Sequence, residues 1–168
     1  MAKADLTAER LRELLHYDPE TGIFIWRVNI AHSRSKSGAT AGNFNQDGYR
    51  IIGIGRRSYC AGRLAWLYIH GCWPTKKIDH RNGQVSDNKI TNLRDVSTSV
   101  NGQNQRKAMS SNYSCGLLGV TFNKRAKKWQ ASIELDGKSH YIGLFQSPVA
   151  AHTAYLSAKR ILHEGCTI

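Results

Sequence analysis

The stretch Asp79-His80-Arg81-Asn82-Gly83 decides how the rest of the chain is organised. An acidic residue stands beside a histidine, and the Asn-Gly pair that follows is typical of a tight turn. Two asparagines come at fixed distances downstream: Asn92 is twelve positions after His80, and Asn101 is nine positions after Asn92. The pattern predicts a strand that ends at a loop and carries reactive side chains into it.

This spacing resembles that of the HNH nuclease family, and the resemblance continues upstream in Arg63-Leu64-Ala65-Trp66 and Gly71-Cys72-Trp73-Pro74. It implies the ββα-metal fold, also called the His-Me finger, in which two short strands and a helix hold one divalent cation. The third position of the family motif is often histidine, and Asn101 stands there in this chain.

The resemblance also implies roles for four residues. His80 and Asn92 are the catalytic residues, His80 as general base and Asn92 as the residue that holds the loop in place, and Asp79 and Asn101 are the metal ligands. A neutral histidine can accept a proton from water near pH 7. Oxygen ligands favour a hard cation, Mg²⁺ or Mn²⁺, over zinc. Because adjacent strand residues point to opposite faces, Asp79 and His80 can share a site only if the strand ends or twists at His80.

The charge of the chain points to a polyanionic partner. There are 24 Lys and Arg against 12 Asp and Glu, a formal net charge of +12. Between Ile30 and Ile78, eight basic residues stand against one acid, Asp47. Nucleic acid is therefore the expected partner, and the resemblance to the HNH family implies that it is double-stranded DNA. A basic protein whose cationic side chains are merely solvated would have the same total charge.

Cysteine usage and the N-terminus bear on where the protein works. The four cysteines, at positions 60, 72, 115 and 166, form no Cys-x-x-Cys pair, which favours reduced intracellular thiols over disulfides or zinc ligands. The sequence has no apolar signal core at its N-terminus and no apolar run long enough to cross a membrane. We expect a cytoplasmic protein of a bacterial host cell, encoded by a phage or mobile element, with no membrane partner and no small-molecule cofactor.

The residues before the motif are expected to form an N-terminal α/β embellishment of the nuclease core. Periodicity predicts helices over residues 5–16 and 61–70, the second ended by Gly71, and strands over 23–26, 49–54 and 58–60. Residues 29–48 are polar and predict a long loop. In the core itself, strands are expected at 76–79 and 93–96, and a helix begins at Ser97 or Thr98.

After Asn101 the composition changes. Residues 102–115 are rich in Asn, Gln and Ser, and they predict a hinge or linker lying on DNA. Residues 119–123, 129–135 and 140–145 predict three antiparallel strands, followed by a helix that Ser147 caps and Gly165 ends. This segment resembles the Apetala-two (ethylene-response-factor) DNA-binding domain over nearly all of residues 112–165, in Gly119-Val120, residues 129–133, residues 141–145 and Ala150-Ala151-x-x-x-Tyr155.

The alternation of side chains along a strand predicts two faces for this C-terminal sheet. Trp129, Ala131, Ile133 and Leu135 should pack on the helix. The opposite face is open, and the resemblance implies that it enters the major groove. Residues expected to contact DNA, over the whole chain, are Arg34, Lys36, Arg56, Arg57, Arg81, Arg106, Lys107, Thr121, Asn123, Arg125, Lys128, Gln130, Ser132 and Tyr141.

The sequence as a whole predicts an α+β protein of two domains. A nuclease domain over residues 1–109 contains the ββα-metal core at about 76–107, and residues 110–168 form a DNA-binding domain, a small three-stranded antiparallel sheet packed on one helix. The predicted activity is metal-dependent hydrolysis of phosphodiester bonds in double-stranded DNA, as a homing-type or phage nicking endonuclease whose C-terminal domain aids site selection.

Two alternatives and two further expectations follow from the same residues. One alternative is a structure-directed nickase acting in phage DNA metabolism, which shares the chemistry and differs in substrate. A chain ending after residue 109 is expected still to bind and nick DNA, and the enzyme to act as a monomer or a DNA-dependent dimer. A protein of another class, a non-catalytic sequence-specific DNA-binding regulator, would use the C-terminal domain but would have no use for the motif at Asp79 and His80.

Overall fold

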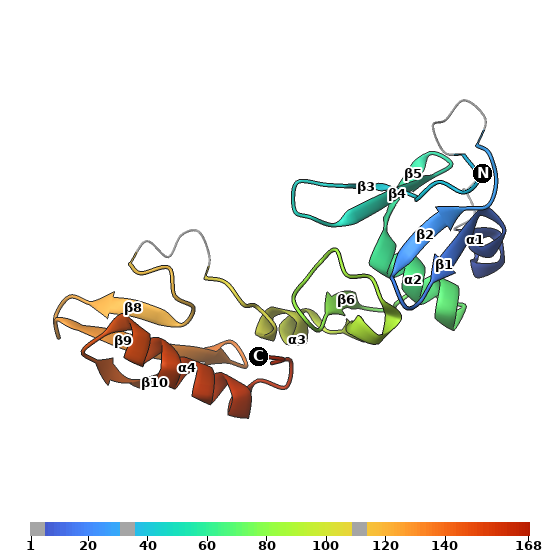
Figure 1. Cartoon of the computed structure of the whole chain (residues 1–168). Helices are drawn as coiled ribbons and strands as arrows, with labels where there is room; N and C mark the ends of the chain where they lie inside the picture. Colours follow the sequence, from blue (N-terminus) through green and yellow to red (C-terminus); the bar gives the residue numbers. More distant parts are fainter. Residues whose placement is uncertain (1–5, 31–35, 109–113) are drawn as a thin grey trace. The chain divides into compact units, whose positions relative to one another are not determined.

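The computed structural model describes residues 6–30, 36–108 and 114–168. The chain forms two compact units, Met1–Ser97 and Thr98–Ile168, each of which combines helices with antiparallel β-structure (Figure 1). Within the described ranges no helix is both long and apolar enough to cross a membrane.

Among its described residues, the first unit contains three small antiparallel sheets and two α-helices. In chain order its elements are α1 (Ala8–Leu14), β1 (Leu15–Asp18), β2 (Ile23–Trp26), β3 (Asn43–Phe44), β4 (Arg50–Ile54), β5 (Arg57–Cys60), α2 (Ala61–His70), β6 (Lys77–His80), the 3-10 helix η1 (Ile90–Asn92) and β7 (Leu93–Val96). β1 pairs with β2, β4 lies between β3 and β5, and β6 pairs with β7.

The N-terminal helix is shorter than the sequence predicts. α1 ends at Leu14, and Leu15 already has an extended backbone, with φ −131° and ψ 142°. Residues 15 and 16, predicted as the end of the helix, therefore begin β1. The physical reason is the burial pattern: Leu15 and Tyr17 are both buried and His16 is exposed, which is the alternation of a strand.

The core of the first unit joins α1, the β1–β2 hairpin and α2. Leu11 from α1, Phe24 from β2 and Leu64 from α2 are fully buried in one cluster. α2 matches its predicted range, and Gly71 ends it in the left-handed conformation at φ 75°, a backbone that favours glycine. α2 thereby forms a rigid support beside the strand that carries the motif.

The second unit has α3 (Thr98–Gln103), β8 (Val120–Asn123), β9 (Lys128–Leu135), β10 (Lys138–Phe145) and α4 (Pro148–Leu162). Its sheet has the order β10-β9-β8. Ala131 and Ile133 of β9 are buried with Ala151 and Tyr155 of α4. The predicted three-stranded antiparallel sheet packed on one helix is confirmed, and so is the predicted face of β9 for Trp129, Ala131 and Ile133.

A glycine allows the closest approach between sheet and helix in this unit. A Cβ at Gly119 would lie 2.0 Å from Cδ2 of Tyr155, and the residue has φ +74°. No side chain fits there, so Gly119 lets the backbone before β8 lie against the Tyr155 ring.

The compact units divide at a different place from the predicted domains. α3 and the residues that follow it belong to the second unit, which begins at Thr98, whereas the sequence predicts a boundary after residue 109. The sequence predicts a hinge over residues 102–115, but the first part of this segment is held in place. Gln103, Asn104 and Arg106 are hydrogen-bonded to the C-terminal tail. Polar composition suggested a linker, but these polar side chains have partners more than fifty residues away.

Candidate active site

The strand β6 carries Asp79 and His80 into the interior of the first unit. Each keeps only 6% of its surface exposed. Asp79 lies opposite Arg94 of β7 and His80 opposite Leu93. The strand ends at His80, where the Gly83 N–H donates to the His80 carbonyl over 2.8 Å and Gly83 has φ 71°. The strand end that the sequence required at His80 is present.

His80 has a specific partner in Asn88. The ring Nε2 of His80 lies 3.3 Å from Oδ1 of Asn88, and Nδ2 of Asn88 donates to the Ser86 carbonyl over 3.1 Å. The bond to Ser86 orients the amide so that its oxygen faces the imidazole. An amide oxygen only accepts hydrogen bonds, so Nε2 carries the ring proton and Nδ1 is the basic nitrogen of the neutral ring.

Burial sets the protonation state of this histidine. It lowers the pKa of His80 from its ordinary value of 6.5, while the hydrogen bond to Asn88 and the charges of Asp79 and Asp87 act in the opposite direction. Desolvation is the largest of these causes because an imidazolium loses more hydration energy than a neutral ring. His80 is therefore neutral at pH 7 and can accept a proton.

Two residues far from the motif in sequence support this pair. The hydroxyl of Tyr17 donates to the Asn88 carbonyl over 2.8 Å. A Cβ at Gly62 would lie 3.1 Å from Oδ1 of Asn88, 3.4 Å from Cγ2 of Ile78 and 3.6 Å from Nε2 of His80. The absence of a side chain at Gly62 thus leaves room for α2 to lie directly beside the imidazole and its partner.

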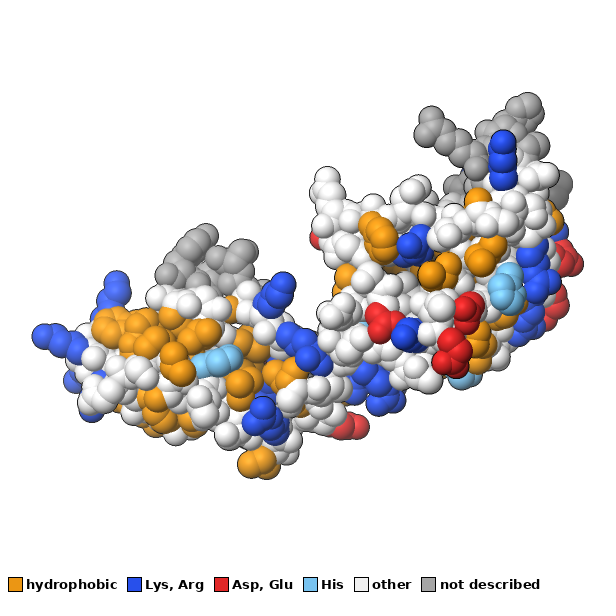
Figure 2. Space-filling model, viewed as in Figure 1, with side chains coloured by type: hydrophobic (Ala, Val, Ile, Leu, Met, Phe, Trp, Pro, Cys, Tyr) orange, Lys and Arg blue, Asp and Glu red, His pale blue; other side chains and the backbone are white. Residues whose placement is uncertain are grey.

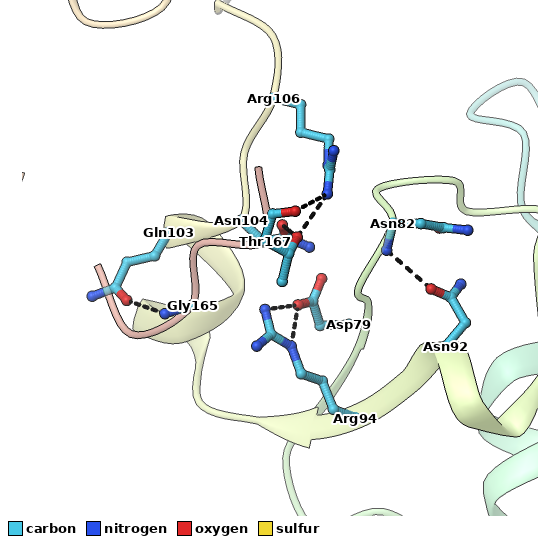
Figure 3. Close-up of polar contacts among 9 residues, drawn as sticks. All are labelled: Asp79, Asn82, Asn92, Arg94, Gln103, Asn104, Arg106, Gly165 and Thr167. Carbon is cyan, nitrogen blue, oxygen red and sulfur yellow. Dashed lines mark hydrogen bonds and ion pairs between the residues drawn. The ribbon is translucent and has the colours of Figure 1, made fainter. Parts of the chain in front are cut away.

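Asn92 ties the two ends of the loop after β6 together. Its Oδ1 accepts from the Asn82 N–H over 2.9 Å (Figure 3). Its Nδ2 donates to the Asp87 carbonyl over 2.8 Å, and its carbonyl accepts from the Arg81 N–H over 2.8 Å. Asn92 is itself buried. These bonds fit the predicted role of holding the His80 loop; a contribution to catalysis stays a prediction.

Asp79 is held by an arginine that the sequence analysis did not select. Arg94 donates to Oδ2 of Asp79 from Nε over 2.8 Å and from Nη2 over 2.7 Å (Figure 3). Asp79 stands in sequence between Ile78 and His80, which both lie beside Gly62, and it pairs with Arg94 of the neighbouring strand β7. The sequence analysis had Arg94 in the triplet Asn92-Leu93-Arg94, but only the strand register of the structure places it opposite Asp79.

Asn101, the other predicted ligand, lies on α3 in the second unit. The segment around it is fixed by the C-terminal tail: Gln103 accepts from the Gly165 N–H over 2.8 Å, and Asn104 accepts from the Thr167 hydroxyl over 2.6 Å (Figure 3). These two bonds span 62 and 63 positions of the sequence, and nothing in the local pattern signals them.

The predicted ligands have the donor chemistry of a hard divalent cation. The carboxylate of Asp79 offers about four acceptor sites on two oxygens, and Arg94 bonds to Oδ2, so an ion at Asp79 would share the carboxylate with a guanidinium. In the part of the chain that the structure describes, no group of three or more His, Cys, Asp or Glu side chains is gathered as a metal site. A ligand set of one carboxylate, one amide oxygen and non-protein oxygens fits Mg²⁺ or Mn²⁺.

A tyrosine beside His80 was also missed. The Tyr49 ring is half-buried with its centroid 6.0 Å from that of His80, in an edge-to-face arrangement. Burial raises the pKa of the Tyr49 hydroxyl, and the charges of Cys60, Asp47 and Asp79 act in the same direction. The hydroxyl is therefore protonated at neutral pH. A single tyrosine at the start of a strand carries no sequence signal for such a position.

The residues predicted to contact DNA are distributed over both units, and Arg34 lies outside the described residues. Lys and Arg side chains are visible on the surface of each unit (Figure 2). The exposed basic residues among those predicted are Lys36, Arg56, Arg57, Arg81, Arg106, Lys107 and Arg125.

The open face of the C-terminal sheet has the predicted residues on it. Thr121 lies opposite Gln130, Asn123 opposite Lys128, and Tyr141 opposite Ser132. Tyr141 is 62% exposed. Asn123 is engaged within the hairpin: its Nδ2 donates to Oε1 of Gln130 over 3.0 Å, and its Oδ1 accepts from the Ala126 N–H.

Comparison with known proteins supports part of this assignment. Residues 59–103, less than half of the chain, match the model of a family described as HNH endonuclease. The match contains His80, Asn92 and Asn101, and it extends across the division between the two units. No curated protein matches the chain.

A solved structure from work on DNA binding and cleavage by the HNH homing endonuclease I-HmuI is similar over 90% of this chain and 88% of that one, at 23% identity and a TM-score of 0.41. A likeness at this TM-score does not establish a shared fold, so the family match over residues 59–103 is the finding that bears on function.

Proposed function

We propose that this protein is a metal-dependent DNA endonuclease that hydrolyses phosphodiester bonds in double-stranded DNA. The observation that carries the proposal is His80: a buried histidine with a lowered pKa, held at Nε2 by Asn88, inside the segment that matches the HNH endonuclease family. The net charge of +12 supports a nucleic-acid substrate.

In the proposed reaction His80 is the general base. Its Nδ1 accepts a proton from the attacking water, while Asn88 keeps the other proton on Nε2 and the imidazole in one orientation. The lowered pKa keeps the ring neutral, and thus able to accept a proton, at pH 7. Asn92 fixes the loop that follows His80.

Asp79 and Asn101 are the proposed ligands of one Mg²⁺ or Mn²⁺. When bound, such an ion supplies Lewis-acid stabilisation of the phosphate and of the departing 3′-oxygen. Arg94 keeps Asp79 oriented through two hydrogen bonds to one carboxylate oxygen.

The C-terminal unit is proposed to aid site selection, as its resemblance to the Apetala-two domain implies. Phosphate contacts supply affinity and base contacts supply choice. The exposed Tyr141 and the polar residues around it are suited to base contacts. With one proposed active site per chain, a monomer nicks one strand in one step and a dimer is needed to cut both; a homing-type or phage nicking enzyme in a bacterial cytoplasm fits these properties.

Supercoiled plasmid incubated with the full-length protein tests the proposal. We expect conversion to nicked circles with Mg²⁺ or Mn²⁺, and none with EDTA. Sequence-specific binding in a mobility-shift assay without any metal-dependent nicking would instead favour the DNA-binding regulator.

A further inference from the structure

The helix that carries Asn101 has little to hold it in place by itself. α3, every residue of which the structure describes, is six residues long and buries none of them. An isolated helix of this length is not stable in water, because forming the first turn costs more than a few hydrogen bonds return. The position of α3 must therefore depend on what it contacts.

The C-terminal tail contacts the end of α3 closely. The Gly165 N–H donates to Oε1 of Gln103 over 2.8 Å (Figure 3). Gly165 is buried, and a Cβ there would lie 2.2 Å from the Val100 carbonyl oxygen and 2.9 Å from Cβ of Gln103. The tail thus lies against α3 at a distance that only glycine permits.

Two residues further along, Thr167 bonds to the chain just after α3. Its hydroxyl donates to Oδ1 of the buried Asn104 over 2.6 Å and accepts from Nη2 of Arg106 over 2.7 Å. The same Arg106 nitrogen also donates to the Thr167 carbonyl over 3.1 Å. Thr167 therefore connects two residues that follow Asn101 by three and five positions.

A buried lysine makes the third connection. Lys159 of α4 is only 1% exposed, and its Nζ donates to the Gln105 carbonyl and lies 5.9 Å from the centroid of the Tyr155 ring. Burying an ammonium group is costly unless it is hydrogen-bonded. The Gln105 carbonyl provides that bond and so joins α4 to the segment after α3. Separating the two would leave the buried Lys159 ammonium group without this hydrogen bond.

We propose that Gly165, Thr167 and Lys159 are positioning residues for Asn101: the C-terminal unit holds the helix that supplies the second metal ligand. The inference rests on the proposed function only for the role given to Asn101. It makes the C-terminal unit a requirement for metal binding as well as an aid in choosing the site.

Two substitutions in the full-length protein weaken these contacts at different points. Thr167→Val keeps the shape of the side chain and removes the hydroxyl, and Gly165→Ala introduces a Cβ against the Val100 carbonyl. Thr167→Ser restores the hydroxyl. Thr153→Val is the matched control for the hydroxyl, because the Thr153 hydroxyl donates to the Val149 carbonyl within α4 itself. Gly53→Ala is the matched control for the glycine, because a Cβ at Gly53 meets open space.

Hydrogen exchange measured by mass spectrometry tests the contact itself. In Thr167→Val, amides of residues 98–104 are expected to exchange about five-fold faster, the factor for loss of about one net hydrogen bond. Exchange in β8, β9 and β10 should not change. Thr167→Ser should restore the wild-type rate, which separates a local effect from general destabilisation. Unchanged exchange of α3 in both Thr167→Val and Gly165→Ala would overturn the inference.

Mn²⁺ binding to the protein–DNA complex, followed by electron paramagnetic resonance, tests the consequence for Asn101. The half-saturating Mn²⁺ concentration is expected to rise about five-fold in Thr167→Val and to return in Thr167→Ser. Looser α3 with unchanged Mn²⁺ binding would show that the tail does not position a ligand. The proposed function would fail in a different way: the wild-type protein would bind DNA but would not nick it with any divalent cation.

Discussion

The loop at His80 and the helix at Asn101 belong to one sequence motif, yet different parts of the chain hold them. Asn88 and Asn92 hold the His80 loop, and both lie within twelve residues of the histidine. The Asn101 helix is held by Gly165 and Thr167, whose bonds span 62 and 63 positions. A short motif thus contains one half that is folded by its own neighbours and one half that depends on the end of the chain.

This difference changes what is expected of a shortened protein. The family match over residues 59–103 treats the motif as one segment, and the sequence analysis expected residues 1–109 to nick DNA alone. A chain ending there lacks Lys159, Gly165 and Thr167. We now expect such a chain to keep the His80 loop and to lose the fixed position of α3.

The largest effect on the nicking rate should come from His80, in the half of the motif that its sequence neighbours hold. Replacing His80 by alanine removes the proposed base, and we expect the nicking rate to fall by about 10²–10⁴-fold. DNA affinity should be nearly unchanged, as measured by fluorescence anisotropy. His16→Ala, at an exposed histidine on β1, is the control. Equal loss of binding and nicking would mean that His80 is structural.

The two proposed ligands should respond alike in activity and differently in stability. Asp79→Ala and Asn101→Ala are both expected to remove metal-dependent nicking. Asp79→Ala also leaves the half-buried Arg94 without its carboxylate and should lower the free energy of unfolding by about 3–5 kcal/mol. Asn101→Ala should change it by about 0.5 kcal/mol or less. Urea denaturation measures both, and a requirement for bound zinc would contradict the oxygen-ligand assignment.

A smaller loss is expected from the partner of the base. Asn88→Ala removes the hydrogen bond that holds Nε2 of His80 and should slow nicking about 10- to 100-fold through misorientation of the ring. Single-turnover rates at saturating DNA and metal are the measurement. Asn43→Ala, at an exposed position on β3, serves as the control. A wild-type rate in Asn88→Ala would remove Asn88 from the mechanism.

The lowered pKa of His80 predicts a direction for the pH dependence. Because the neutral ring is the active form, single-turnover nicking should be maximal at pH 7 and fall only below the ordinary value of 6.5. The folded state binds the proton less readily than the unfolded state, so His80 also lowers the stability of the fold as the pH drops below about 6.5. A rate that still rises steeply between pH 7 and 8 would contradict a lowered pKa.

The smallest effect on rate should come from the open face of the C-terminal sheet. Tyr141→Ala and Gln130→Ala are expected to relax site preference while changing the nicking rate at saturating DNA by less than about two-fold, since base contacts specify rather than catalyse. Sequencing of nick sites from wild type and variants measures the preference. Identical, sharply defined sites would show that this face does not read the target.

The sequence by itself determined the elements whose signals are local. The end of α2 at Gly71, the turn that follows His80, and the C-terminal sheet with Ala131 and Ile133 toward α4 all follow from periodicity and turn chemistry, which act over a few residues. The motif residues were identified by their spacing, which resembles that of the HNH family, and their catalytic roles stay predictions.

Only the tertiary structure decided how the reactive side chains are held. Three contacts show this: the hydrogen bond between Asn88 and His80, the ion pair of Arg94 with Asp79, and the bond of the tail to the end of α3. The residue types involved form no distinctive pattern in the sequence. Such contacts depend on hairpin register, on the room left by Gly62 and on chain segments brought together by burial of separate apolar cores. For that reason a polar stretch that resembles a linker in sequence is, in the folded protein, the anchored end of the helix that carries Asn101.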